Sequence, residues 1–173
     1  MKGVIFNVVQ EAVEAEFGAD TWDAILDKAG VTGAYTSLGN YDDAQLVAIV
    51  GAAATALGKD VPATLRWVGE RAFAPLAARH PAYLEGHTGL GTFLPALNNI
   101  IHPEVLKLYP DSIVPQFDLE TLDDDHIAMV YRSPRALPDL AVGLALGAAR
   151  HFGETWEAET HNVDGGTRIV LRR

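Results

Sequence analysis

The sequence predicts an α+β fold, in which a helical N-terminal part is followed by an antiparallel sheet with one packed helix. Up to Tyr109, apolar residues recur at three- and four-residue spacing, the period of helices that bury one face. After Pro110 the spacing changes to the alternation that is typical of strands, with one helical segment between them. No internal repeat is visible, so we expect residues 1–173 to form a single domain.

Four helices are predicted before residue 80, and residues that start or stop helices bound each of them. A glycine, which readily ends a helix, follows each of the first three. Aspartates precede the third and fourth, and we expect Pro75 to end the fourth because proline removes a backbone donor. The predicted helices are residues 1–17, a short helix around Trp22 that stops at Gly30, residues 42–57 and residues 60–75.

The second part of the chain contains one more helix before the sheet and one within it. An irregular stretch rich in glycine, residues 80–91, separates the first four helices from the fifth. Two strands flank a turn of three aspartates, and two more flank an Asp-Gly-Gly turn near the C-terminus. The predicted elements are a helix over 92–109, strands over 117–120 and 127–131, a helix over 140–148, and strands over 156–160 and 169–171.

Composition excludes several classes of protein. The chain has 13 Lys and Arg against 23 Asp and Glu, a net charge of −10, and nucleic-acid binding requires clustered basic residues. The chain contains no cysteine, which rules out disulfides, thiolate metal sites and cysteine nucleophiles. No segment approaches the roughly 18 apolar residues of a membrane span. We therefore expect a cytoplasmic protein with neither a nucleic-acid nor a membrane partner.

His102 has the most unusual setting of the six histidines. No pair of histidines has the spacing of a two-histidine zinc site on one helix. His102 lies in an apolar helix and directly precedes Pro103, which predicts a kink at the imidazole. A single helical histidine is more often an ordinary packed residue than a ligand, so this pattern alone leaves both interpretations open.

Tyr131, Ser133 and Arg135 form a second candidate site. In a regular strand these alternate residues would share one side and present a phenol, a hydroxyl and a guanidinium together. Such a row suits a carboxylate or phosphate, because arginine binds these groups through two parallel hydrogen bonds. The alternative is a polar strand end at the surface, and Pro134 makes a regular strand less favourable.

Together these residues resemble the haem-nitric oxide/oxygen binding (H-NOX) family, which includes the haem domain of soluble guanylate cyclase. The resemblance extends over essentially the whole chain and combines the histidine, the Tyr-x-Ser-x-Arg triplet and the domain size. It includes Met1–Asn7, Trp22-Asp23, Ile101–Val105, Lys107–Tyr109, Tyr131-x-Ser133-x-Arg135, Gly143-Leu144 and His151-Phe152.

The resemblance implies that haem b, iron protoporphyrin IX, lies between the two subdomains. Family members bind the iron through a proximal histidine, and His102 stands at the matching position. The triplet Tyr131, Ser133 and Arg135 matches the residues that hold the haem propionates. Pro115 matches a proline that presses on the porphyrin and distorts it.

The resemblance also bears on which gas is bound. Oxygen-binding relatives place a tyrosine nine residues after the tyrosine of the triplet, where this chain has Leu140. Dioxygen is held by a hydrogen-bond donor in the pocket, whereas nitric oxide binds ferrous iron strongly without one. We therefore expect a sensor that selects nitric oxide, binds carbon monoxide more weakly and excludes oxygen. The predicted distal pocket consists of Ile5, Val9, Ala74, Leu140 and Leu144.

Signalling without catalysis is the role that the family suggests. Nitric oxide is expected to weaken the bond between iron and His102, so that the kinked helix shifts relative to the C-terminal subdomain. Output then passes to a separate partner, and family analogy suggests a histidine kinase or a cyclic-dinucleotide enzyme.

Three other functions stay open, two from the residues and one within the family that the chain resembles. A metal-dependent hydrolase would use His80, His87 or His102 with nearby carboxylates. A module without haem would use Arg135 to bind a phosphate ligand or a protein. An oxygen-binding haem sensor is the alternative within the family, and Leu140 argues against it.

Overall fold

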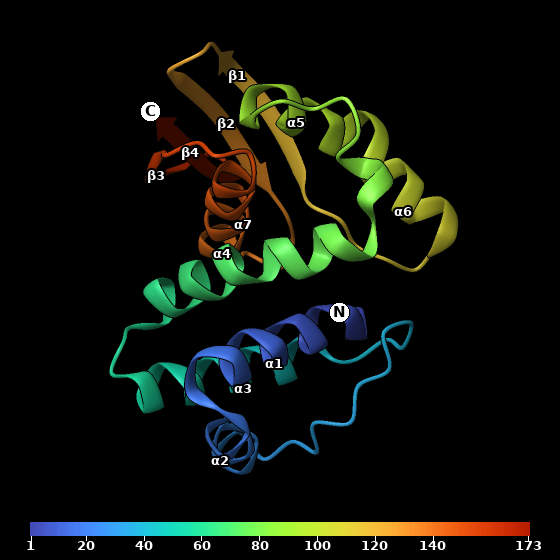
Figure 1. Ribbon diagram of the computed structural model, residues 1–173, viewed down its shortest axis with the longest axis vertical. Helices are drawn as coiled ribbons and strands as arrows, with labels where there is room; N and C mark the ends of the chain where they lie inside the picture. Colours follow the sequence, from blue (N-terminus) through green and yellow to red (C-terminus); the bar gives the residue numbers. More distant parts are fainter.

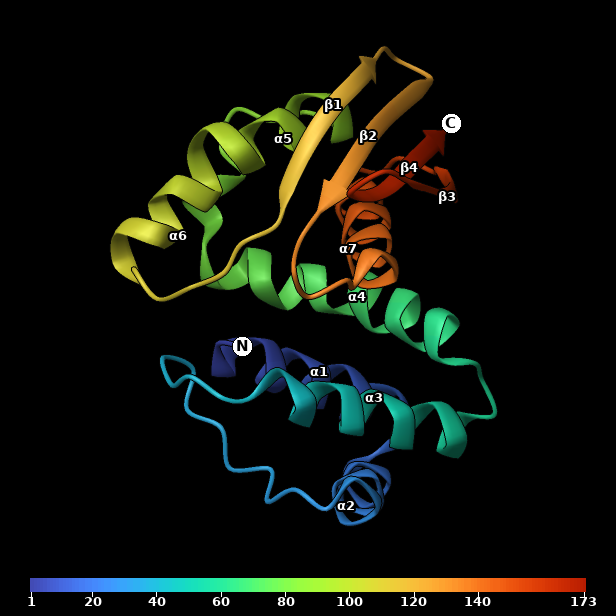
Figure 2. The same cartoon turned by 180° about the vertical axis from the view of Figure 1, so that it is seen from behind.

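The computed structural model describes residues 1–173 and confirms the α+β fold. Helices α1 to α3 form one layer, and the sheet with α5, α6 and α7 forms the other (Figure 1). Helix α4 crosses between the two layers in both views (Figures 1 and 2). The helices are α1 (Gly3–Phe17), α2 (Ala19–Ala29), α3 (Asp43–Leu57), α4 (Val61–Arg79), the short η1 (Pro81–Tyr83), α5 (Leu90–Ala96), η2 (Leu97–Ile101), α6 (His102–Leu108) and α7 (Pro138–His151).

The N-terminal layer has its own hydrophobic core. Phe6, Ile25 and Ile49, from three different helices, are at most 1% exposed and pack together with the inner face of α4. The predicted bounds of these helices are confirmed, since α1 ends before Gly18 and α3 before Gly58. No single helix is long and apolar enough to cross a membrane; α3 and α4 meet that test only as a pair, bent by 102° at their junction.

Helix α4 continues past Pro75, contrary to the prediction that it ends there. It runs on to Arg79, whose guanidinium donates to the Pro75 carbonyl at 2.8 Å. Phe73 before the proline and Ala77 after it are both buried against the C-terminal core. Packing on both sides of Pro75 therefore outweighs the single backbone hydrogen bond that proline removes.

The sheet is antiparallel and confirms the two predicted hairpins. Its strand order is β1-β2-β4-β3, which leaves β1 at one edge. Ile127 and Met129 of β2 and Ile169 of β4 are buried with residues of α7 on one face of the sheet. The strands are β1 (Gln116–Leu122), β2 (His126–Arg132), β3 (Glu157–Val163) and β4 (Gly166–Arg172).

The helix that carries His102 is irregular one turn earlier than predicted. His102 itself has helical angles, φ −64° and ψ −41°, and Pro103 occupies the first turn of α6, where a missing donor is tolerated. The preceding segment η2 is a π-helix, in which the His102 N–H donates to the Leu97 carbonyl. The predicted kink at the imidazole is therefore wrong, and the helix absorbs the irregularity as a π-turn.

Helices α4 and α7 approach closely through glycines, and Gly147→Ala tests this contact. A Cβ at Gly147 would lie 2.6 Å from the Glu70 carbonyl oxygen and 2.7 Å from Phe73 Cβ. We expect the substitution to lower the free energy of unfolding by about 1–3 kcal/mol. In the control Gly51→Ala, where a Cβ in α3 meets nothing within 4 Å, we expect stability to rise by roughly 0.5–1 kcal/mol. Chemical denaturation measures the free energy of unfolding of both variants. Equal changes in the two would contradict the close contact at Gly147.

Candidate functional site

A cavity of about 950 Å³ lies between the two layers and brings the predicted cofactor residues together. His102, Pro115 and the triplet of Tyr131, Ser133 and Arg135 all line it. Hydrophobic residues make up 26 of its 39 lining residues, so most of its wall suits an apolar ligand. Its volume is at the upper end of the range of about 300–1,000 Å³ that is typical of small-molecule pockets.

The His102 imidazole is prepared to act as a ligand. Its Nδ1 is buried and has no hydrogen-bond partner. Burial lowers the pKa of His102 because it disfavours the charged form, and the nearby Pro115 carbonyl opposes this only in part. The ring lies against Phe117, with centroids 6.1 Å apart and planes inclined by 27°. A neutral imidazole with an unused nitrogen in a cavity wall can donate a lone pair to a metal.

His102 has no companion that could complete a site for a bare metal ion. No group of three or more His, Asp or Glu side chains in the structure is placed to bind one. Protein-bound zinc requires three or four protein ligands, so a hydrolytic metal site at His102, His80 or His87 has no support in this geometry. A single histidine instead suits an iron whose other ligands come from a macrocycle.

Contrary to the prediction, strand alternation does not align the triplet. A turn brings its three residues together. Strand β2 ends at Arg132, and the turn that follows is closed by a bond from the Ala136 N–H to the Ser133 carbonyl, 3.2 Å. The Ser133 hydroxyl accepts from the Arg135 N–H at 3.2 Å. The Tyr131 hydroxyl accepts from the Leu137 N–H at 3.2 Å, so its own proton remains available as a donor.

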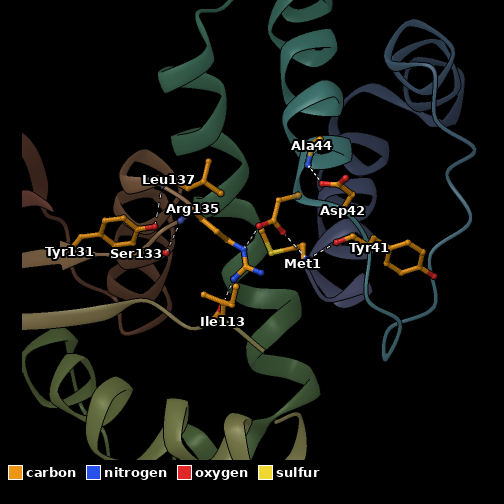
Figure 3. A network of polar contacts seen from close by, with 10 residues as sticks. Met1, Tyr41, Asp42, Ala44, Ile113, Tyr131, Ser133, Arg135 and Leu137 are labelled. Atoms are coloured by element: carbon orange, nitrogen blue, oxygen red, sulfur yellow. Dashed lines mark hydrogen bonds and ion pairs between the residues drawn. The ribbon is translucent and has the colours of Figure 1, made fainter. Parts of the chain in front are cut away.

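Arg135 joins the two layers through a network of charges (Figure 3). Its Nε donates to Asp43 Oδ2 at 2.7 Å, and a terminal nitrogen donates to the Ile113 carbonyl. The N-terminal ammonium of Met1 lies 2.7 Å from Asp43 Oδ1 and donates to the Tyr41 carbonyl at 2.6 Å. Two cations, Arg135 and the ammonium, thus share the single Asp43 carboxylate at the wall of a largely apolar cavity, and a guanidinium in such a wall suits a flat apolar ligand with carboxylate tails.

The charge network predicts a small dependence of stability on pH. Burial by itself would raise the pKa of Asp43, but bonds from the ammonium and the Arg135 guanidinium outweigh it, and the pKa is lowered. Folding therefore gains from the ionised carboxylate at neutral pH, and the gain is lost as pH falls through the lowered pKa.

We expect Asp43→Asn to lower the free energy of unfolding of the haem-free protein by at most about 1 kcal/mol at pH 7, because the pair is partly exposed. The difference from the wild type should shrink as pH falls through the lowered pKa of Asp43, because the wild-type carboxyl is then protonated as well. Denaturation at a series of pH values measures this. The control Asp111→Asn removes an exposed carboxylate of the cavity rim that makes no ion pair, and a matching pH profile there would contradict the assignment.

The structure places part of the predicted distal pocket in the cavity wall. Leu140 and Leu144 of α7 line the cavity, but Ile5, Val9 and Ala74 do not. Ile5 and Val9 pack against the core of the N-terminal layer, and Ala74 is exposed.

The neighbouring residues Val4 and Phe73 line the cavity instead. Adjacent residues on a helix point about 100° apart, so a shift of one position in α1 or α4 exchanges a wall residue for a core or surface residue. Val4 and Phe73 are apolar, as are Leu140 and Leu144, so this part of the cavity lining has no polar side chain.

Several residues of the site have no local signal in the sequence. Asp43 is 92 residues from Arg135 and was assigned only to a helix start. His80 and Tyr83, around the short helix η1, line the cavity although they stand in a segment that reads as irregular chain. Asn98 hydrogen-bonds to the backbone of β1 across 19 residues. Only tertiary contacts bring these groups to the site, and periodicity within one element cannot find them.

Comparisons with known proteins agree with this geometry. A family model described as Haem-NO-binding matches residues 2–160. An H-NOX protein from S. oneidensis, solved in the Fe(II)NO ligation state, is 29% identical with a TM-score of 0.89, over 99% of this chain and 98% of that one. No significant match to a curated protein sequence is found.

Two further solved structures are similar over nearly the same length. An unliganded Fe(II) H-NOX protein from K. algicida is 25% identical with a TM-score of 0.87, covering 99% of this chain and 96% of that one. An oxygen-binding H-NOX domain related to soluble guanylate cyclases, solved as its oxygen complex, is 25% identical with a TM-score of 0.81, covering 99% and 94%. The similar structures therefore include complexes of different gases.

Proposed function

The chain belongs to the haem-NO-binding (H-NOX) family, and from this membership we propose that residues 1–173 form one haem-binding domain that senses nitric oxide. The observation that carries the proposal is the joint presence of His102 and the triplet in one largely apolar cavity. The half-buried His102 imidazole, the apolar walls and the Arg135 guanidinium match the iron, the ring and the propionates of haem b in turn.

In this proposal each group of haem b has a residue to hold it. His102 is the iron ligand, and Pro115, in the same wall, bears on the face of the ring. Tyr131, Ser133 and Arg135 bind the propionates with the phenol, the hydroxyl and the guanidinium. Arg135 donates through Nε to Asp43 and through one terminal nitrogen to the Ile113 carbonyl, and its other N–H groups are left for a propionate.

Selectivity for nitric oxide follows from the apolar wall. When bound, ferrous haem supplies an iron that binds nitric oxide strongly and carbon monoxide more weakly, whereas oxygen requires a hydrogen-bond donor. Leu140 and Leu144 have no donor to offer, and neither have Val4 and Phe73. Polar residues also line the cavity; among them, His80 and Tyr83 come from the segment around η1, and His80 is exposed.

Signalling is proposed to run through His102 and the helix that it begins. His102 would hold the iron, and α6 would be free to move if that bond were lost, because α6 is joined to the preceding helix by a π-turn and carries no fully buried residue. The domain catalyses no reaction in this proposal, and the moved surface is read by a separate histidine kinase or cyclic-dinucleotide enzyme.

Absorption spectroscopy of the purified, haem-loaded protein tests the proposal. We expect a Soret band after reduction, a shift of that band with nitric oxide and with carbon monoxide, and no stable ferrous-oxygen spectrum in air. A protein that stays colourless with excess haemin would overturn haem binding. A stable oxygen spectrum would overturn selectivity alone, and loss of that spectrum in Tyr83→Phe would then identify the donor.

A further inference from the structure

Asn98 connects the helix that carries His102 to the edge of the sheet. Its side-chain Nδ2 donates to the Phe117 carbonyl, and its Oδ1 accepts from the Phe117 N–H at 3.2 Å. Asn98 lies in η2, four residues before His102, and Phe117 is the second residue of β1. Because β1 is an edge strand, these two backbone groups have no neighbouring strand to bind on that side.

This pairing is specific to a side-chain amide. A planar amide carries a donor and an acceptor side by side, so Asn98 binds both backbone groups of one residue as a neighbouring strand would. Neither a carboxylate nor an aliphatic side chain can do both. Helix propensity and burial alone would therefore not require an asparagine one turn before the histidine, whereas this pairing does.

Phe117 connects the same contact to the imidazole. Its backbone is held by Asn98, the residue is only 7% exposed, and its ring stacks on His102 with centroids 6.1 Å apart. Its ring also contacts Tyr131, at a centroid distance of 5.8 Å, and Pro115 lies two residues before it. Asn98 thus anchors the helix to the part of the molecule that holds the residues proposed for the ring and the propionates.

The backbone of the helix provides little resistance to movement near the histidine. Pro95 lies inside α5, Pro103 lies in the first turn of α6, and the π-turn η2 lies between them. Each proline removes one backbone donor, and π-turns are less regular than α-helix. The two hydrogen bonds of Asn98 join η2 to the edge strand of the sheet, one turn before His102.

We propose that Asn98 is a positioning residue, which holds His102 in place for the iron and opposes its release. The proposal rests on the proposed role of His102 as the iron ligand. With the pairing intact, η2 and the imidazole keep a defined position beside Phe117. Without it, the helix is free to follow the released histidine, and the balance shifts toward release.

The first test concerns the pairing itself and needs no haem. In Asn98→Ala, we expect amide hydrogen exchange at Phe117 in the haem-free protein to be about tenfold faster or more, since the edge N–H loses its acceptor. The matched control is Asn99→Ala, because Asn99 is the adjacent residue, is exposed and makes no hydrogen bond. Unchanged exchange at Phe117 in Asn98→Ala would show that the pairing is absent and overturn the proposal.

The second test compares the haem-loaded variants. We expect Asn98→Ala to bind haem in the same ratio as the wild type, with a shifted or broadened iron-histidine stretching band in its resonance Raman spectrum. The ratio of five- to six-coordinate nitric oxide complex should rise about tenfold, with no change in Asn99→Ala. Asn98→Asp, which keeps the shape and loses the donor, should shift both readouts in the same direction and replaces Asn98→Ala if that variant is unstable.

The outcomes separate the two proposals. A wild-type protein without a Soret band overturns the haem-sensor function and this role of Asn98 with it. A wild-type protein with an iron-histidine band, and Asn98 variants whose band and coordination ratio equal those of Asn99→Ala, overturns the role of Asn98 alone.

Discussion

His102→Gly is expected to abolish signalling while leaving a protein that binds haem once free imidazole is supplied. The substitution removes the nitrogen proposed to bind iron and leaves a gap that imidazole can fill. Loss of a partner beyond the ligands costs a metal site about 10–100-fold in affinity, so loss of the ligand itself should cost more. Haem titration with and without imidazole measures this loss.

The loss of signalling is measured on the helix itself. In the wild type we expect nitric oxide to speed amide exchange in α6, because release of His102 loosens the helix that it begins. In imidazole-rescued His102→Gly, the imidazole is not joined to the chain, and exchange in α6 should not respond. His161→Gly, at an exposed position of β3, is the control and should behave as the wild type. A full response in the rescued variant would remove His102 from the mechanism.

Leu140→Tyr is expected to convert the protein into an oxygen binder. Leu140 lies in the wall of the cavity on the first turn of α7, and a tyrosine there would supply the hydrogen-bond donor that the apolar wall lacks. A hydrogen bond to a group that carries partial charge contributes about 1.5–3 kcal/mol, which corresponds to oxygen dissociation slower by about tenfold to hundredfold. A ferrous-oxygen spectrum that persists in air, and its decay rate, measure the effect.

Leu140→Phe separates the hydroxyl from the size of the ring. Phenylalanine fills the same space and has no donor, so we expect this variant to give no stable oxygen complex and to keep its nitric oxide spectrum. If both variants form the oxygen complex, or neither does, Leu140 is not the position that decides between the gases.

Local features of the sequence were sufficient for most of the fold. Glycines end α1 and α3 where expected, because glycine adopts a positive φ angle without steric cost, whatever surrounds it. The apolar runs Ile127–Tyr131 and Ile169–Leu171 likewise mark β2 and β4, and every residue of both runs is buried. The residues themselves singled out His102 and Arg135, and the family resemblance that they carry added Pro115; all three line the cavity.

Where a local sequence rule and a distant contact disagree, the tertiary structure decided the course of the backbone. Proline should end a helix, yet α4 passes Pro75 because burial of Phe73 and Ala77 against the other layer outweighs one hydrogen bond. Pro103 should kink the chain at His102, yet the irregularity is taken up one turn earlier as η2.

What the sequence determined by itself is therefore most of the helices and strands and the candidate residues for the cofactor. What only the tertiary structure decided is which groups meet: Arg135 with Asp43 across 92 residues, Asn98 with Phe117, and Val4 and Phe73 in the cavity wall in place of their neighbours. The reason is that helix ends and strand alternation are governed by interactions between near neighbours. Contacts across the cavity depend on how two layers pack, and a rotation of one residue on a helix, about 100°, changes them.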